Sequence, residues 1–349
     1  MEISGDHPCL RSRWIYGTMI ISRFGRLLAT SACAGRRGAS NLTIFRDLTD
    51  EELNLIEAVP VPDETLSGHA HTIEFDIAPP GRWVGVNWPE LWRYRDLFLV
   101  MAWRDISVRY KQTALGVLWA IIQPFISMVL FTVIFNRVAH ITSGDPNVPY
   151  PIFVYSGLLF WQFYSTTLGN ASNSMVVNAP IIQKVYFPRL IVPATAATTA
   201  LVDMAFASVI LGGMMIYYHS APSLFGVLLV PVLIIISVLS ALGLGLFLAA
   251  INLKYRDVRY AVPFFIGVLM YVTPVIYPAK LLRRFPAIEG LMVWLNPIAG
   301  VINSARATLI GDGVFEPSVL GISALMSLLY FVAGLYYFRS TERYFADIA

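Results

Sequence analysis

Residues 109–124 constrain the fold of this chain most strongly, because a cluster of basic residues leads there directly into a long apolar run. Arg104, Arg109 and Lys111 precede a hydrophobic stretch of about 20 residues, the length needed to cross the hydrocarbon core of a bilayer. Positive charge beside a membrane-spanning helix normally stays on the cytoplasmic side. The sequence therefore predicts that the chain begins inside the cell and first crosses the membrane outward here.

The composition is that of an integral membrane protein. Of the 349 residues, 56% are hydrophobic and only 13% are charged, whereas soluble domains carry roughly 25% charged residues. The net charge of +3 is small and much of the basic charge lies beside apolar runs, so topology explains it better than nucleic-acid binding does. Cys9 and Cys33 are the only cysteines, which excludes a disulfide framework and a CxxC metal site.

Three parts follow one another along the chain. Residues 1–70 lack any long apolar run, and we expect a disordered extension. Residues 71–113 form a cytoplasmic segment in which apolar and charged residues alternate, and its uninterrupted apolar core, 97–103, is too short to span a bilayer. This pattern predicts either an interfacial helix lying on the membrane or an amphipathic helix packed on protein. Residues 114–349 form the membrane domain.

Six apolar stretches near the required length follow, at residues 114–135, 151–172, 193–217, 224–251, 262–277 and 318–338. If the chain starts inside, the later cytoplasmic segments carry Lys184, Arg189, Lys254, Arg256, Arg259, Arg339 and Arg343, and the external segments carry Arg137, Lys280, Arg283, Arg284 and Arg306. Together with the basic residues before the first span, this asymmetry predicts an all-α membrane protein with six transmembrane helices and both termini in the cytoplasm.

Residues 279–312 are apolar but interrupted by Pro286, Gly290, Pro297 and Gly300. Asn296 and Pro297 are typical of an N-cap followed by the first residue of a helix. Neither half of this stretch reaches spanning length, so we expect two short re-entrant helices between the fifth and sixth spans.

The sequence contains no nucleotide-binding loop of the GxxxxGK[ST] type, because none of its four lysines follows a glycine. Any ATP hydrolysis would therefore come from another polypeptide, and we expect no cofactor on this chain. The five histidines are scattered, which gives no metal-ligand spacing.

Polar residues recur at helical spacing along the second predicted span, where Tyr155, Gln162, Thr166 and Asn170 fall near one face. Polar groups inside a bilayer face protein or water, so this stripe predicts either a hydrophilic conduit or hydrogen bonds between helices. Asp203 is a single acidic residue well inside the third span. It is either functional or bonded within the helix bundle.

Several short motifs together resemble one family, the type-2 ABC exporter permeases for polysaccharides and polyol phosphates, which export O-antigen, capsule and teichoic acid. The motifs are Tyr110-Lys111-Gln112-Thr113, Leu115-Gly116, Leu118-Trp119, Gln123-Pro124, Val185-Tyr186-Phe187-Pro188-Arg189, Tyr255-Arg256-Asp257-Val258 and Leu295-Asn296-Pro297. The resemblance covers residues 72–343 and leaves the first 70 residues without an assignment.

The resemblance implies a homodimeric permease, not itself an enzyme, that works with two ABC ATPase subunits carrying ATP and Mg²⁺. Its substrate would be a lipid-linked glycan exported across a bacterial inner membrane. The interfacial helix would be the cytoplasmic gate, and residues 279–311 the periplasmic gate. Gate residues would be Trp103, Arg104, Arg109 and Lys111, and ATPase-coupling residues would be Ile181, Gln183, Lys184, Val185, Tyr186, Phe187 and Arg189.

Two other functions fit some of these features. Asp203 would suit a proton-coupled secondary transporter, although such carriers place several ionisable groups in a relay. A membrane-embedded enzyme that modifies glycans is the other alternative, although a His/Asp/Glu constellation for it is missing from the predicted external segments.

Overall fold

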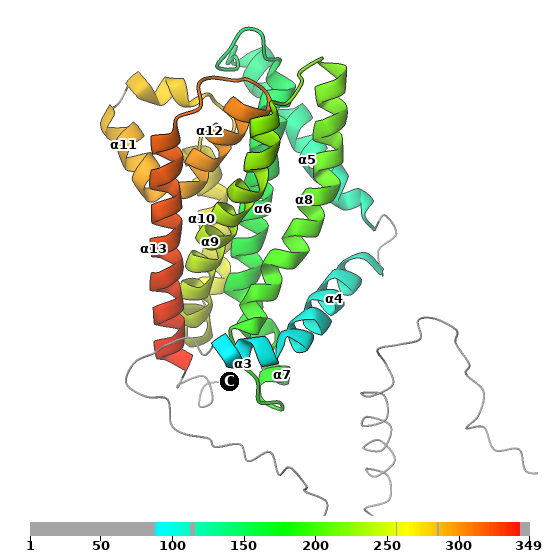
Figure 1. Cartoon of the computed structure of the whole chain (residues 1–349), viewed down its shortest axis with the longest axis vertical. Coiled ribbons are helices and arrows are strands. Elements are labelled where there is room, and N and C mark those ends of the chain that lie inside the picture. Colours follow the sequence, from blue (N-terminus) through cyan, green and yellow to red (C-terminus); the bar gives the residue numbers. More distant parts are fainter. Residues whose placement is uncertain (1–87, 112–115, 256, 285, 343–349) are drawn as a thin grey trace, which may run out of the picture. The chain divides into compact units, whose positions relative to one another are not determined.

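The computed structural model describes residues 88–111, 116–255, 257–284 and 286–342, so the 1–70 extension, residues 71–87 and Gln112, Thr113, Leu115 and Arg256 of the family motifs lie outside it. The described residues form helices and contain no strand (Figure 1). The helices are α3 (Trp88–Arg93), α4 (Arg95–Lys111), α5 (Leu118–Phe131) with its π-helical continuation η2 (Thr132–Val138), α6 (Tyr150–Val177), α7 (Ala179–Ile182), α8 (Ile191–Tyr217), α9 (Leu224–Lys254), α10 (Val258–Val272), the 3-10 helix η3 (Ala279–Arg284), α11 (Pro286–Leu295), α12 (Pro297–Leu309) and α13 (Pro317–Thr341). All of them belong to the unit Ala78–Ala349.

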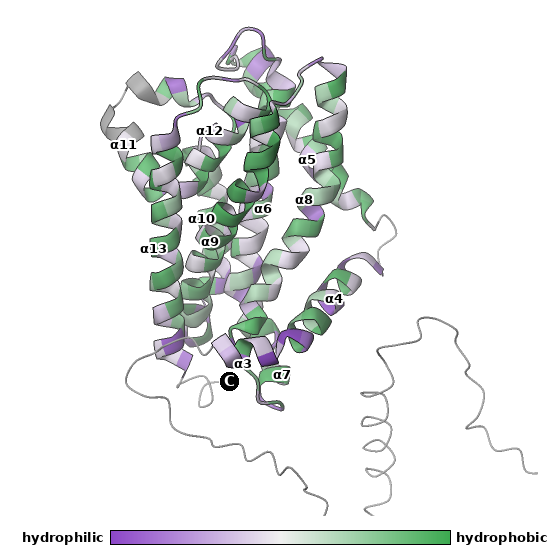
Figure 2. Cartoon of the chain, in the orientation of Figure 1, coloured by the Kyte–Doolittle hydropathy of each residue, from purple (hydrophilic) through white to green (hydrophobic). Residues whose placement is uncertain are grey.

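Four stretches of the described residues are long and apolar enough to cross a membrane: Leu118–Val138, Ile191–Tyr217, Leu224–Lys254 and Pro317–Thr341. They correspond to the first, third, fourth and sixth predicted spans. Helix α6 is long enough at 28 residues but is richer in polar residues, and α10 has only 15 residues. Figure 2 shows the contrast between these mostly hydrophobic helices and α4, where hydrophilic residues concentrate.

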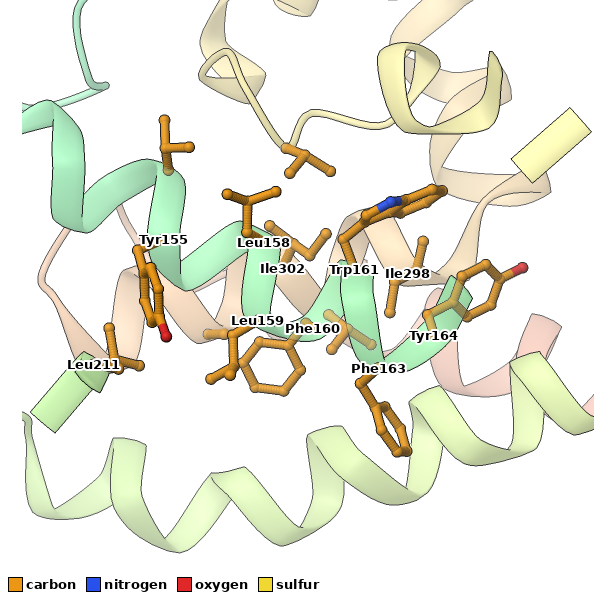
Figure 3. Packing of buried hydrophobic residues seen from close by; sticks show 14 of the residues in the cluster. Tyr155, Leu158, Leu159, Phe160, Trp161, Phe163, Tyr164, Leu211, Ile298 and Ile302 are labelled. Atoms are coloured by element: carbon orange, nitrogen blue, oxygen red, sulfur yellow. The ribbon is translucent and has the colours of Figure 1, made fainter. Parts of the chain in front are cut away.

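Helix α6 is the centre of the bundle and packs against α5, α8, α9, α10 and α12. Most of its residues are buried, and its aromatic and aliphatic side chains point in several directions (Figure 3). The side chain of Tyr155 lies beside Leu211 of α8, whereas Ile298 and Ile302 of α12 cover another side. A helix that is covered on most sides can carry polar residues without exposing them to lipid.

Small residues allow helices α9 and α13 to approach closely. A Cβ added at Gly334 would overlap the backbone carbonyl of Gly243, and a Cβ at Gly243 would overlap the backbone of Tyr330 and Phe331. Gly245, on the neighbouring face of α9, lies against Ala171 of α6. Glycine at these positions replaces side-chain contacts by close backbone packing, the usual solution between helices in a membrane.

The described part of the stretch 279–312 forms the 3-10 helix η3 and the two short α-helices α11 and α12. The sequence predicts two short helices here, and their re-entry into the outer leaflet stays a prediction. Pro297 is the first residue of α12 and Asn296 is its N-cap, as the sequence predicts, but the Asn296 side chain makes no capping hydrogen bond. Instead the Asn296 side chain donates a hydrogen bond to the Thr273 hydroxyl over 2.7 Å. Because Thr273 begins the irregular chain after α10, this bond connects the start of α12 to the end of α10.

Arg306 of α12, which the sequence places in an external segment, is only 2% exposed. Its guanidinium donates to the carbonyl oxygens of Phe153 (3.2 Å), Pro274 (2.6 Å) and Val275 (2.5 Å), and its Cζ lies 3.7 Å from the centre of the Phe153 ring. We call these four residues the Arg306 cluster. Irregular backbone inside a bilayer needs such partners, because no water is present to satisfy its carbonyls. The cluster therefore connects α6, α12 and the irregular chain after α10.

Candidate functional site at the α4 groove

A groove of about 600 Å³, lined by both polar and apolar side chains, lies between α4, α6, α7 and α8. We call it the α4 groove. Its polar lining consists of Arg104, Asp105 and Arg109 from α4, Asn170, Asn173, Ser174 and Asn178 from the end of α6, and Thr195 and Thr199 from α8. Because Arg104 and Arg109 come from the basic segment before the first span, the groove opens at the end of the bundle where the sequence places the cytoplasm.

Side-chain hydrogen bonds hold α4 against α6 and α8 at one end of the groove. Arg104 Nη2 lies 2.7 Å from Asp105 Oδ1 and donates to Asn178 Oδ1 over 2.8 Å. The Thr195 hydroxyl donates to Asp105 Oδ2 over 3.1 Å. Arg104 and Asp105 therefore neutralise each other. At the same time Arg104 binds the end of α6 and Asp105 binds α8.

Asp203 holds the other end of α4. Its carboxylate lies 2.6 Å from Arg109 Nη2 and also accepts a hydrogen bond from the Tyr110 hydroxyl. We call these three residues the Asp203 cluster. Burial and the hydrogen bond to Asp203 raise the pKa of Tyr110, so its hydroxyl remains a donor near neutral pH. The acidic residue in the third predicted span is therefore bonded within the bundle.

The four predicted gate residues divide into two pairs. Arg104 and Arg109 line the groove. Trp103 and Lys111 are exposed on α4 and do not line it. Helix α4 buries Met101 and Ala102, and other apolar side chains along it remain exposed, so one face packs on protein and another is available to a membrane surface. The burial of α4 is therefore compatible with both predictions, an interfacial helix on the membrane and a helix packed on protein.

The seven predicted coupling residues also divide. Ile181, Gln183, Lys184, Val185 and Tyr186 are exposed on α7 and the turn after it, and Tyr186 is the most exposed of them at 80%. Phe187 is buried in a smaller apolar core with Met175 and Phe338, and Arg189 donates to the carbonyl of Glu342 over 2.6 Å. Five residues therefore form a surface, and the two that follow hold it on the bundle.

The four predicted conduit residues do not form one continuous line. Tyr155 is buried and its hydroxyl donates to the Ala207 carbonyl over 2.8 Å. Gln162 and Thr166 lie 3.4 Å apart beside a cavity of about 20 Å³ that Asp203 also lines. Asn170 is exposed in the α4 groove. Neighbouring helices, rather than the spacing of polar residues on α6, decide which of these side chains are accessible.

Sequence reasoning did not identify Asp105, Asn178 or Thr195, which join α4 to the bundle. Asp105 follows Arg104 directly, and this adjacency is the one signal that points to it. Asn178 and Thr195 are ordinary polar residues at helix ends, and their partners are far away in the sequence. Packing alone brings them together.

The part of the chain that is similar to known proteins includes both the Asp203 cluster and the Arg306 cluster. Residues 96–310 match the family described as ABC-2 type transporter. The chain is similar to the O-antigen export system permease protein RfbA of Myxococcus xanthus, with 28% identity over 259 residues, or 74% of this chain and 97% of that protein. An RfbA of Klebsiella pneumoniae is 28% identical over 253 residues (72% and 95%). The polysialic acid transport protein KpsM of Escherichia coli is 23% identical over 245 residues (68% and 91%).

Proposed function

This chain belongs to the ABC-2 type transporter family, and from that membership we propose that it is the permease subunit of an ATP-driven exporter. The substrate is a lipid-linked polysaccharide or polyol phosphate polymer, moved across the bacterial inner membrane. The names of the relatives, which concern O-antigen export and polysialic acid transport, support this substrate class. The exposed surface at α7, beside the α4 groove in a chain with membrane-length apolar helices, is the observation that carries the proposal.

The proposed topology has six crossings, made by α5 with η2, α6, α8, α9, α10 and α13. Helix α6 qualifies because most of its polar residues are covered by the surrounding helices, and α10 reaches spanning length with the irregular chain that follows it. Helices α11 and α12 then re-enter the outer leaflet and form the periplasmic gate. Residues 1–70 are an extension, residues 71–113 contain the cytoplasmic gate helix, and both termini are cytoplasmic.

Two ATPase subunits bind ATP and Mg²⁺ and dock on two copies of this chain. The docking surface consists of Ile181, Gln183, Lys184, Val185 and Tyr186, which combine exposed apolar and basic groups. Phe187 and Arg189 transmit the force, because both are bound to the bundle. ATP does work on the permease only if it binds the two conformations with different affinity.

A short path of contacts connects this surface to the gate helix. The backbone N–H of Ile181 donates to the Asn178 carbonyl over 3.0 Å, and the Asn178 side chain accepts from Arg104 of α4 over 2.8 Å. Displacement of α7 by the ATPase therefore moves the group that holds α4. Release of α4 widens the α4 groove toward Asn170, Gln162 and Thr166, which we assign to the substrate path. Tyr155 supports that path by joining α6 to α8 through its hydrogen bond to the Ala207 carbonyl.

The experiment that tests this function is gentle purification of the chain from its native membrane, followed by mass spectrometry of the proteins that copurify. We expect an ABC ATPase in equal amount, and no ATP hydrolysis by the chain alone. A solitary chain under conditions that preserve other complexes, or hydrolysis by the isolated chain, would contradict the proposal.

The same preparation separates the alternatives. Pairing of Asp203 with Arg109 and Tyr110 removes the observation that motivated proton coupling. Transport driven by a pH gradient without an ATPase would nevertheless support a secondary transporter. Turnover of a lipid-linked glycan by the isolated chain would support an enzyme.

A further inference from the structure

A second groove, of about 340 Å³, lies at the same end of the bundle as the α4 groove and shares no lining residue with it. We call it the α3 groove. Helices α3 and α4 form one wall with Trp88, Trp92 and Phe98. Residues at the start of α8 and along α9 and α13 form the others, among them Ala194 and Leu335. A volume above about 300 Å³ is large enough for a small-molecule ligand.

The α3 groove is apolar apart from one group. Of the residues that line it, Arg95 alone carries a charge. Its Cζ lies 5.3 Å from the centre of the Trp92 ring, and 58% of its side chain is exposed, so the guanidinium lies beside the groove and in contact with solvent. The neighbouring carboxylate of Asp96 is 3.8 Å away and even more exposed, a surface pair that contributes little and leaves Arg95 able to bind another anion.

Three of the helices around this groove, α8, α9 and α13, are long and apolar enough to cross the membrane. Their side of the groove is therefore continuous with surfaces that face hydrocarbon. On the other side, Trp88 and Trp92 are 68% and 71% exposed. Tryptophan is enriched at the headgroup level of a bilayer, where the ring contacts both apolar and polar groups. The composition of the groove thus fits a position between the headgroup level and the apolar region of a bilayer.

We propose that the α3 groove binds one phospholipid of the surrounding bilayer, with an acyl chain along the apolar walls and the phosphate at Arg95. The groove and a phospholipid have the same arrangement of charged and apolar parts, because Arg95 lies at the exposed edge and the rest of the wall is apolar. Such a lipid fills the space between α3 and the bundle and holds α3 and the start of the gate helix α4 at the membrane surface. It is distinct from the exported substrate, whose path we assign to the α4 groove.

The test is titration of the purified complex with phosphatidylglycerol, followed by native mass spectrometry. Wild type should retain one lipid per chain with saturable binding. Ala194→Trp fills the groove and should weaken binding at least tenfold, since several buried methylene groups lose their contacts. Arg95→Gln should weaken it about tenfold, the effect of one charged hydrogen bond. Val332→Trp is the matched control, because Val332 is exposed on α13 outside the groove and should bind lipid as wild type does.

Folding is checked by gel filtration and thermal unfolding of each variant. Arg95→Gln keeps the proposal testable if Ala194→Trp does not fold, because the Arg95 side chain is mostly exposed. Unchanged phosphatidylglycerol affinity in a folded Ala194→Trp variant, or in Arg95→Gln, would overturn the proposal. Displacement of the lipid by a polyprenyl-linked glycan would overturn it as well, in favour of a substrate site, and displacement by the ATPase would reassign the groove to a protein interface.

Discussion

The Arg306 cluster and the Asp203 cluster each hold helices together through an arginine, but they do so in different ways. Arg306 is almost completely buried, and its hydrogen-bond partners are three backbone carbonyls. The Arg109 side chain is 40% exposed, and its partner is the carboxylate of Asp203, with 12% exposed. One arginine is therefore removed from water, whereas the other remains in contact with it.

This difference has a mechanical consequence. Phe153, Pro274 and Val275 are buried, so separating their carbonyls from Arg306 would leave buried acceptors without a donor and is costly. The Arg109 guanidinium is already partly solvated and can exchange its carboxylate for water, so separating α4 from α8 costs less than separating Arg306 from its carbonyls. We conclude that α12 is held permanently at one end of the bundle and that α4 is held reversibly at the other. Motion of the proposed periplasmic gate then falls to α11 rather than to α12.

The largest expected effect comes from Arg306→Met. It leaves the carbonyls of Phe153, Pro274 and Val275 without their donor and should destabilise the chain by about 3–5 kcal/mol. Thermal or denaturant unfolding in detergent measures this. Arg137→Met is the control, because Arg137 is exposed at the end of η2 and should change stability by no more than about 0.5 kcal/mol. Equal stability of the two variants would remove the distinction between the clusters.

A smaller effect is expected from Gly157→Ala. A Cβ at this position would overlap the Arg306 guanidinium and lie 3.1 Å from the Val275 carbonyl, so overpacking should cost about 1–3 kcal/mol. Gly213→Ala is the matched control in a neighbouring helix, because nothing lies within 4 Å of its added Cβ. Alanine there should be neutral or stabilising. The same unfolding assay compares the two, and tolerance of Gly157→Ala would mean that Arg306 can move.

Asp203→Asn should cost only about 1 kcal/mol, because Arg109 is partly solvated and regains water. Its main effect should be mobility of α4, measured as faster motion of a spin label at Val108. Raising the ionic strength of wild type should increase mobility in the same direction, since salt screens the pair. An unchanged spectrum in Asp203→Asn would show that the cluster does not hold α4.

The smallest effect on stability is expected from Tyr186→Ala. The Tyr186 ring is 80% exposed, so the free energy of unfolding should change by no more than about 0.5 kcal/mol. Copurification of the ATPase should nevertheless fall, because the ring belongs to the proposed docking surface. Phe187→Ala provides the contrast: it removes a buried side chain and should destabilise the chain. Full ATPase recovery with Tyr186→Ala would place the interface elsewhere.

Sequence reasoning succeeded where a long run of apolar residues decides the structure. Uninterrupted apolar runs identify α5, α8, α9 and α13, and Pro297 identifies the start of α12. It did not reveal which charged side chains are buried. Arg306 lies in a predicted external segment, and only the carbonyls of α6 and of the chain after α10 make its burial possible.

The candidate site was predicted in part for the same reason. Arg104 and Arg109 are visible because basic residues before a span have a known meaning. The partners of α4 are not visible, because Asp203 lies 93 residues after Tyr110 and Asn178 lies 74 residues after Arg104. Tyr155 shares a stripe with Asn170 in the sequence, yet α8 covers the first and leaves the second in the groove.

The most direct test of reversible attachment at α4 and permanent attachment at α12 is double electron–electron resonance on the complex with its ATPase, with and without ATP. One permease copy carries labels at Val108 and Val177, across the α4 groove, or at Val138 and Val314, near the other end; all four residues are exposed. We predict that ATP changes the Val108–Val177 distance distribution and leaves the Val138–Val314 distribution unchanged. An unchanged groove distance together with a shift in the second pair would contradict the account.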